Sequence, residues 1–168
     1  EINKNILVVG DSIAPNVVNM LNYSKKAKNF SVNKLDYDDL CFLINEKFIE
    51  KVVNRKKKEC NKNFEKLNKS TYLKNSDIII IANWWRTFSI KNFEPYVNYL
   101  KKNINKNAKI IILSNKPIFD VIDLNYLKYK KNPDITIESF FYKNLQKDRY
   151  KINDKIKSIS KKSQIKFF

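Results

Sequence analysis

Four consecutive isoleucines, Ile78 to Ile81, lie between Asp77 and Ala82 and are the clearest strand signal in the chain. The run is continuous and does not alternate with polar residues, which is typical of a strand at the centre of a parallel sheet, buried on both faces. Continuous apolar runs also occupy residues 5–10 and 108–114. Parallel strands need crossover connections, so the pattern predicts an α/β fold.

The stretches between these runs carry further helix and strand signals. Helices are predicted over about residues 15–23, 46–68, 90–103 and 136–161, and strands over 30–35 and 164–168. Residues 40–44 fit either a short helix or a strand, and Pro117 and Pro133 mark a long loop. We therefore predict one domain over residues 1–168. Its predicted fold is a flavodoxin-like three-layer α/β/α sandwich around a parallel sheet of about five strands.

The only glycine, Gly10, ends the first apolar run and is followed by Asp11 and Ser12. Glycine is needed where the backbone turns sharply or approaches another segment closely, so we expect a special turn at the carboxyl end of the first strand. Ligands bind at that position in open α/β sheets. Ser12 is a candidate nucleophile there, and its backbone N–H is a candidate oxyanion donor. The alternative is that Asp11 and Ser12 only cap the first helix.

A second group of candidate residues follows the central strand. Asn83 comes directly after it and is a candidate oxyanion donor, because it should lie at the same sheet edge as Ser12. Trp84, Trp85 and Arg86 come next, and together with Asp11 they are our candidate substrate-binding residues. The tryptophans either line a pocket for an acyl or sugar group or are buried in the core.

The chain is strongly basic, with 34 Lys+Arg against 17 Asp+Glu and a formal net charge of +17. Arg55, Arg86 and Arg149 are its only arginines. One interpretation is a surface that binds polyanions. The other is a solvated lysine coat that follows from an AT-rich coding sequence, and we expect this one, with no specific binding of nucleic acid, because nucleic-acid readers favour arginine.

The composition of the chain excludes some kinds of functional site and restricts others. The chain has no histidine, so it contains neither a Ser-His-Asp triad nor a His-containing zinc site, and we expect no metal and no other cofactor. Cys41 and Cys60 either form one bridge or remain buried thiols, and thiols are our expectation. No stretch is long enough for a transmembrane helix, and no signal peptide is recognised. The sequence starts just before one strand and stops on another, so we expect it to belong to a longer protein.

The motifs resemble the SGNH (GDSL-type) hydrolase family, and within it the domains fused to bacterial acyltransferase-3 membrane proteins. The resemblance covers nearly the whole chain, but its only sharp motif is Gly10-Asp11-Ser12. The other matching stretches are Asp77 to Trp85, Ile110 to Leu113 ending near Pro117, and Phe141 to Asn153 with Arg149. The resemblance implies a flavodoxin-like fold and ester hydrolysis or O-acetyl transfer to a glycan. It also implies an extracytoplasmic or periplasmic location, with an upstream membrane acyltransferase domain in the same polypeptide.

By this resemblance Ser12 is the nucleophile and Asn83 an oxyanion donor. Nothing matches the family's second-block glycine, and the Asp-x-x-His block that supplies the base does not occur. A serine without a base is a poor nucleophile, so we expect this chain alone to be inactive. The alternatives are a lysine-rich polyanion-binding module and a degenerate SGNH domain with a structural or glycan-binding role.

Overall fold

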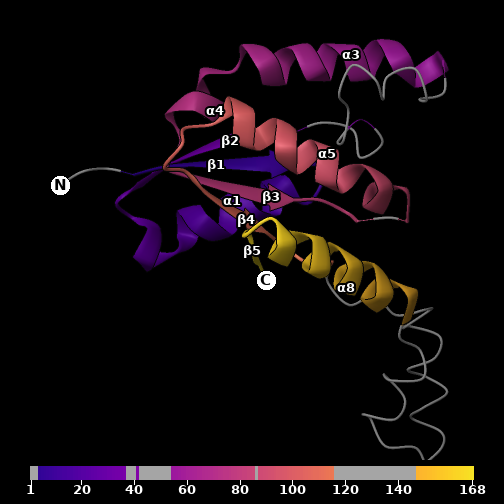
Figure 1. Ribbon diagram of the computed structural model, residues 1–168. Coiled ribbons are helices and arrows are strands. Elements are labelled where there is room, and N and C mark those ends of the chain that lie inside the picture. Colours follow the sequence, from indigo (N-terminus) through magenta and orange to yellow (C-terminus); the bar gives the residue numbers. More distant parts are fainter. Residues whose placement is uncertain (1–3, 37–40, 42–53, 86, 116–146) are drawn as a thin grey trace, which may run out of the picture.

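The computed structural model describes residues 4–36, 41, 54–85, 87–115 and 147–168. Its strands are β1 (Lys4–Gly10), β2 (Phe30–Asp36), β3 (Ile78–Ala82), β4 (Lys109–Ile112) and β5 (Lys166–Phe167). Its α-helices, labelled in Figure 1, are α1 (Ala14–Tyr23), α3 (Asn54–Lys69), α4 (Thr71–Asn75), α5 (Thr87–Asn103) and α8 (Lys147–Lys162). A short 3-10 helix, η1 (Lys25–Ala27), follows α1.

The strands form one parallel sheet in the order β2-β1-β3-β4-β5. The chain runs outward from β1 to β2, returns to β3 on the other side of β1, and then continues to β4 and β5. The direction of winding therefore reverses between β1 and β3, which is where open α/β sheets bind ligands. Gly10 pairs with Asp36 on one side and with Ala82 on the other, so the carboxyl ends of these strands lie together.

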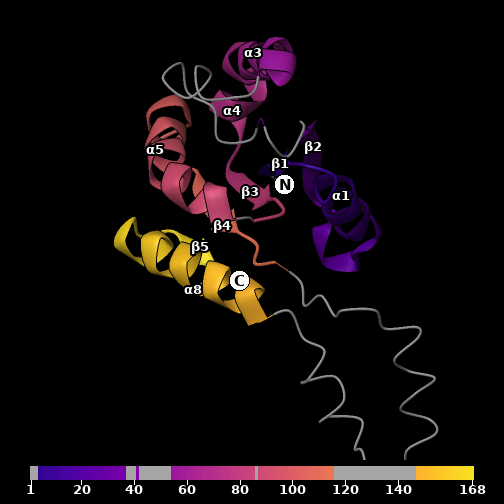
Figure 2. The same ribbon diagram turned by 90° about the vertical axis from the view of Figure 1, so that its right-hand side faces the viewer.

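Helices cover both faces of the sheet, as Figure 2 shows with α1 on one side and α5 and α8 on the other. The face toward α1 carries Ile6, Val8 and Ile80. The opposite face carries Leu7, Val9, Leu35, Ile79, Ile81, Ile110 and Ile112, which belong to the larger core cluster. Neighbouring residues of one strand point to opposite faces, so a continuous apolar run fills both cores.

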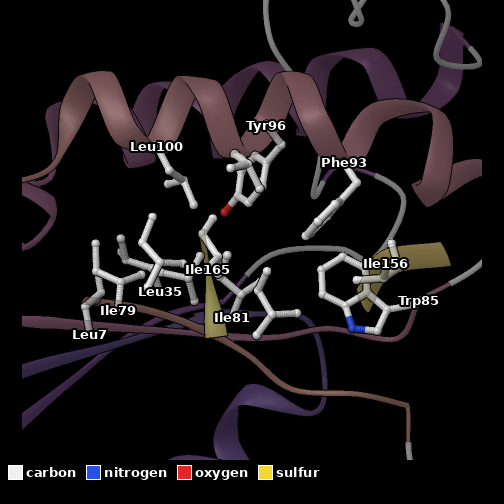
Figure 3. Close-up of a cluster of buried hydrophobic side chains, with 14 of the residues drawn as sticks. Leu7, Leu35, Ile79, Ile81, Trp85, Phe93, Tyr96, Leu100, Ile156 and Ile165 are labelled. Atoms are coloured by element: carbon white, nitrogen blue, oxygen red, sulfur yellow. The ribbon is translucent and has the colours of Figure 1, made fainter. Parts of the chain in front are cut away.

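The larger core lies between the sheet and α5 (Figure 3). Phe93, Tyr96, Val97 and Leu100 recur at helical spacing on α5 and are almost fully buried. Ile152 and Ile156 of α8 join the same cluster. The predicted α/β class and flavodoxin-like three-layer sandwich are confirmed by this arrangement.

Some predicted boundaries differ from the observed ones. The helix α5 begins at Thr87, before the predicted residue 90, and α4 was not predicted, because five residues are too few to show a helical period. Ser70 caps α4 by accepting a hydrogen bond from the Tyr72 N–H at 3.2 Å. Residues 40 and 42–44, the loop with Pro117 and Pro133, and the predicted helical residues 46–53 and 136–146 lie outside the described residues.

The expectation of two free thiols is wrong. Cys41 and Cys60 form a disulfide, with their Cα atoms 4.8 Å apart and a separation of 19 positions in sequence. Both cysteines are buried, and Cys60 lies on the inward face of α3 near Phe64 and Leu67. Sequence spacing alone did not show that the two thiols meet, because the folded chain brings Cys41 back to α3.

Candidate functional site

Ser12 and Asn83 follow neighbouring strands at the reversal point of the sheet. Gly10 at the end of β1 pairs with Ala82 at the end of β3, so both candidate residues lie at the same carboxyl edge, as the sequence predicted. Ser12 is exposed, whereas the side chain of Asn83 is buried with 2% of its surface exposed. The edge therefore combines an accessible hydroxyl with a buried amide.

Gly10 is required here for a close approach between two backbones. A Cβ built on Gly10 would lie 1.8 Å from the carbonyl oxygen of Ala82, which is far too short for two atoms that are not bonded to each other. The φ angle of Gly10 is not positive, so the residue is not needed for a left-handed turn. The glycine therefore lets β1 and β3 end side by side with Ser12 next to the central strand.

Asp11 joins the Ser12 turn to the loop after β3. Its buried carboxylate accepts the Trp84 N–H at 2.7 Å and the Ile13 N–H at 3.0 Å. The second bond closes an Asx-type turn over Ser12. Asp11 was a predicted substrate-binding residue, and the structure shows it binding the backbone on both sides of the edge.

Helix capping does not account for Ser12. The N-cap residue of α1 is Ile13, and Pro15 lies in the first turn, as predicted. The Ser12 hydroxyl makes no hydrogen bond with the described part of the chain. An exposed hydroxyl without a structural hydrogen bond at this edge is open to a substrate.

The amide of Asn83 is incompletely hydrogen-bonded although it is buried. Its Nδ2 donates only a long bond of 3.4 Å to the Trp84 carbonyl, and its Oδ1 has no partner. A buried polar group without a full set of partners is unfavourable unless a ligand or water completes it. The long Nδ2 bond is one that a stronger acceptor such as an oxyanion could replace, whereas Oδ1 only accepts and would need a separate donor.

The two tryptophans occupy different environments. Trp85 is fully buried, meets Phe93 edge-on at 5.1 Å between ring centroids, and donates its Nε1–H to the Leu113 carbonyl at 2.6 Å. Of the two alternatives for the tryptophans, Trp85 therefore follows the second: it is part of the core and does not line an open pocket. Trp84 is partly buried at the edge, and Arg86 lies outside the described residues.

Two asparagines that were not predicted as site residues hold this edge together, although Asn153 ends one of the stretches that carry the family resemblance. Asn115, just beyond β4, accepts the Trp85 N–H and donates to the Trp85 carbonyl, both at 2.8 Å. Asn153 of α8 binds the backbone of Asn115 in the same way: its Oδ1 accepts the Asn115 N–H at 3.0 Å, and its Nδ2 donates to the Asn115 carbonyl at 3.2 Å. The position of Asn115 after a strand, like that of Asn83, is the signal that could have found it, but asparagine is too common in this chain for that signal to discriminate.

The described residues contain no cluster of three or more His, Cys, Asp or Glu side chains that could hold a metal. They also contain no helix long and apolar enough to cross a membrane. The edge offers a hydroxyl, an amide and backbone N–H groups. Acyl chemistry at a serine also needs a proton acceptor, and the chain has no histidine to provide it.

Together, the fold and the edge define a flavodoxin-like α/β domain with an exposed serine after its first strand. Among solved structures, it is similar to the periplasmic domain of a lipopolysaccharide acetyltransferase of Salmonella ser. Paratyphi A, with a TM-score of 0.69 and 14% sequence identity. The match covers 99% of this chain but 66% of that chain, so this chain spans just under two thirds of its neighbour. No protein-family model and no curated protein sequence matches. At this identity the likeness establishes the fold.

Proposed function

We propose that the chain is an SGNH-type domain for O-acyl transfer or ester hydrolysis on a glycan or cell-surface polysaccharide, with Ser12 as nucleophile. The observation that carries the proposal is the exposed Ser12 hydroxyl beside the buried, under-bonded Asn83 amide at the reversal point of the sheet. The fold shared with an acetyltransferase domain supports the same class of chemistry. The polysaccharide substrate follows from the family resemblance and remains part of the proposal.

The chemistry would proceed through an acyl-enzyme. The Ser12 Oγ attacks the acyl carbonyl and loses its proton to a base, and the carbonyl oxygen becomes an oxyanion. The backbone N–H of Ser12 and the Asn83 amide would stabilise that oxyanion. The leaving alcohol takes the proton, and an acceptor hydroxyl or water then removes the acyl group from Ser12.

In this proposal the base comes from outside this sequence, because the family's base is a histidine and the chain contains none. Asp11 does not fill the role, since its carboxylate binds the Ile13 and Trp84 N–H groups. We propose that the family's Asp-x-x-His block belongs to the same protein. An upstream membrane acyltransferase domain is a further part of the proposal.

An extracytoplasmic location is also part of the proposal. The Cys41–Cys60 disulfide supports it, because disulfides persist mainly in oxidising compartments such as the periplasm. The neighbouring structure is itself a periplasmic domain.

Hydrolysis of p-nitrophenyl acetate tests the proposal. The assay compares this 168-residue chain with a longer polypeptide that carries its native flanking residues, each also as Ser12→Ala. Ser31→Ala, which removes an exposed hydroxyl from β2, is the matched control. We expect turnover by the longer polypeptide that Ser12→Ala abolishes and Ser31→Ala leaves unchanged. Without a base, oxyanion donors leave a residual effect of roughly 10³ over water, too slow for this assay.

Two results would contradict parts of the proposal. Clear Ser12-dependent turnover by the 168-residue chain would show that the missing-base argument is wrong. A longer polypeptide that contains Asp-x-x-His yet stays inert on acetyl esters and acetyl donors would indicate a degenerate domain.

A further inference from the structure

The outer face of α1 differs from the rest of this lysine-rich surface. The helix sequence APNVVNMLNY has no charged residue, although 30% of the whole chain is charged. Its inner side packs on the sheet through Ala14, Val17, Val18 and Leu21. The surface that α1 itself presents to solvent is therefore uncharged, and positive charge resumes just after it with the exposed Lys25 and Lys26 of η1.

Four of the five exposed residues of α1 make up this outer face, with Asn22 exposed beside them: Asn16, Asn19, Met20 and Tyr23. They are three or four positions apart, so they lie along one side of the helix. Met20 and Tyr23 keep 72% and 88% of their surface exposed, more than any other large hydrophobic residue in the described part of the chain. The face therefore combines two exposed apolar side chains with asparagine amides and no charge.

This uncharged face leads away from the candidate nucleophile. Ser12 lies two residues before the first residue of α1, and the helix returns antiparallel to β1 along the outside of the sheet (Figures 1 and 2). A helix of this length extends for about 15 Å. A chain-like ligand lying on the face would thus have one end at Ser12.

We propose that the outer face of α1 binds an uncharged stretch of polysaccharide and guides it toward Ser12. Asparagine amides offer donors and acceptors that match sugar hydroxyls. The Tyr23 ring offers an apolar surface with a polar tip, which suits the C–H face of a sugar ring. Met20 adds an adaptable apolar contact. The inference rests on the proposed function, to which it adds the nature of the acceptor.

A glycan fits this face better than a protein does. A stable protein interface buries about 800 Å² on each partner, more than one side of a three-turn helix provides. A second copy of this chain is disfavoured because both copies carry a net charge of +17. An anionic polymer would select the lysine-rich surfaces and gain nothing from an uncharged one.

The test begins with a printed array of neutral and acidic bacterial oligosaccharides in 0.15 M salt. The strongest neutral ligand is then titrated into the isotope-labelled 168-residue chain, and the side-chain amide signals of Asn16 and Asn19 are followed by NMR. Tyr23→Ala should lower the affinity about tenfold or more. Asn16→Ala and Asn19→Ala should each lower it a few-fold.

Two kinds of control accompany these variants. Tyr72→Ala and Tyr150→Ala remove tyrosines that are 46% and 44% exposed on α4 and α8, and should leave the affinity unchanged. Ester hydrolysis by the longer polypeptide is measured in parallel, which separates binding from turnover. If the longer polypeptide fails to hydrolyse acyl esters while binding still maps to α1, only the enzymatic proposal fails.

Several results would overturn the inference. One is that no neutral oligosaccharide on the array binds. Another is that the control tyrosine variants lose as much affinity as Tyr23→Ala does. A third is that only acidic glycans bind and that salt abolishes their binding. A dimer that Tyr23→Ala dissociates would show instead that the face binds a second copy.

Discussion

Substitution of the only glycine tests how closely β1 and β3 must approach each other. In Gly10→Ala, the new Cβ would lie 1.8 Å from the carbonyl oxygen of Ala82 and 2.6 Å from its carbonyl carbon. Real Cβ atoms essentially never come within 3.0 Å of another heavy atom, so the two strand ends must separate by more than 1 Å. Both atoms belong to the backbone, and no side-chain rotation can relieve the contact.

The cost can be worked from what that separation disrupts. Forcing one extra methyl group into a packed core costs about 1–3 kcal/mol. Opening the edge also weakens the ladder at Gly10 and Ala82 and the 2.7 Å bond from the Trp84 N–H to Asp11. Each lost hydrogen bond adds about 1 kcal/mol, so we expect a loss of about 3–5 kcal/mol in the free energy of unfolding. That is a large part of the stability of a typical domain, about 5–15 kcal/mol.

Urea denaturation followed by far-ultraviolet circular dichroism and tryptophan fluorescence measures this loss. Ser31→Ala, at an exposed position of β2, is the control and should change the free energy of unfolding by less than about 0.5 kcal/mol. A Gly10→Ala protein less than about 1 kcal/mol below the parent would refute the close-approach argument, because an overlap this large cannot relax so cheaply.

Three further predictions concern stability. Replacing Cys41 and Cys60 with serine should lower the free energy of unfolding by about 3 kcal/mol, and a parent whose denaturation is insensitive to reductant would contradict the disulfide. Asn115→Ala should lower the free energy of unfolding by about 2–4 kcal/mol, because the N–H and the carbonyl of Trp85 both lose the Asn115 side chain as a buried partner. A loss below about 1 kcal/mol would show that these two hydrogen bonds are not needed for stability. Burial raises the pKa of Tyr99 above its usual 10.0, so its proton is lost at lower pH in the unfolded chain than in the folded one. The contribution of Tyr99 to stability is therefore complete below about pH 10 and is lost as the pH rises through the folded-state pKa, and Tyr99→Phe should show a shallower alkaline decline in urea midpoint than the parent.

Much of the fold could be predicted from the chain because its signals are local. The continuous apolar runs of β1, β3 and β4 indicated strands buried on both faces, and α1 and α5 showed helical spacing. The rule that parallel strands end at one edge then correctly placed Ser12 and Asn83 at the same edge of the sheet. The five residues of α4 were missed because they are shorter than two helical turns.

The connections within the candidate site could not be predicted, since they join segments distant in sequence. Asp11 and Trp84 are 73 residues apart, and Trp85 and Asn115 are 30 apart. Hydrophobic periodicity tells which face of an element is buried, but a hydrogen bond depends on which atoms meet across two elements. The chain contains many asparagines, and the sequence around Asn115 and Asn153 does not show that these two bind the backbone of another segment.

By itself, therefore, the sequence determined the order of strands and helices, the parallel sheet and the edge at which Ser12 lies, because backbone sterics and burial period are properties of short segments. Only the tertiary structure decided that Gly10 serves a close approach, that Trp85 is core, that Asp11 bridges two loops, and that Cys41 pairs with Cys60. Each of these depends on a distance between two segments, which folding sets and local sequence does not.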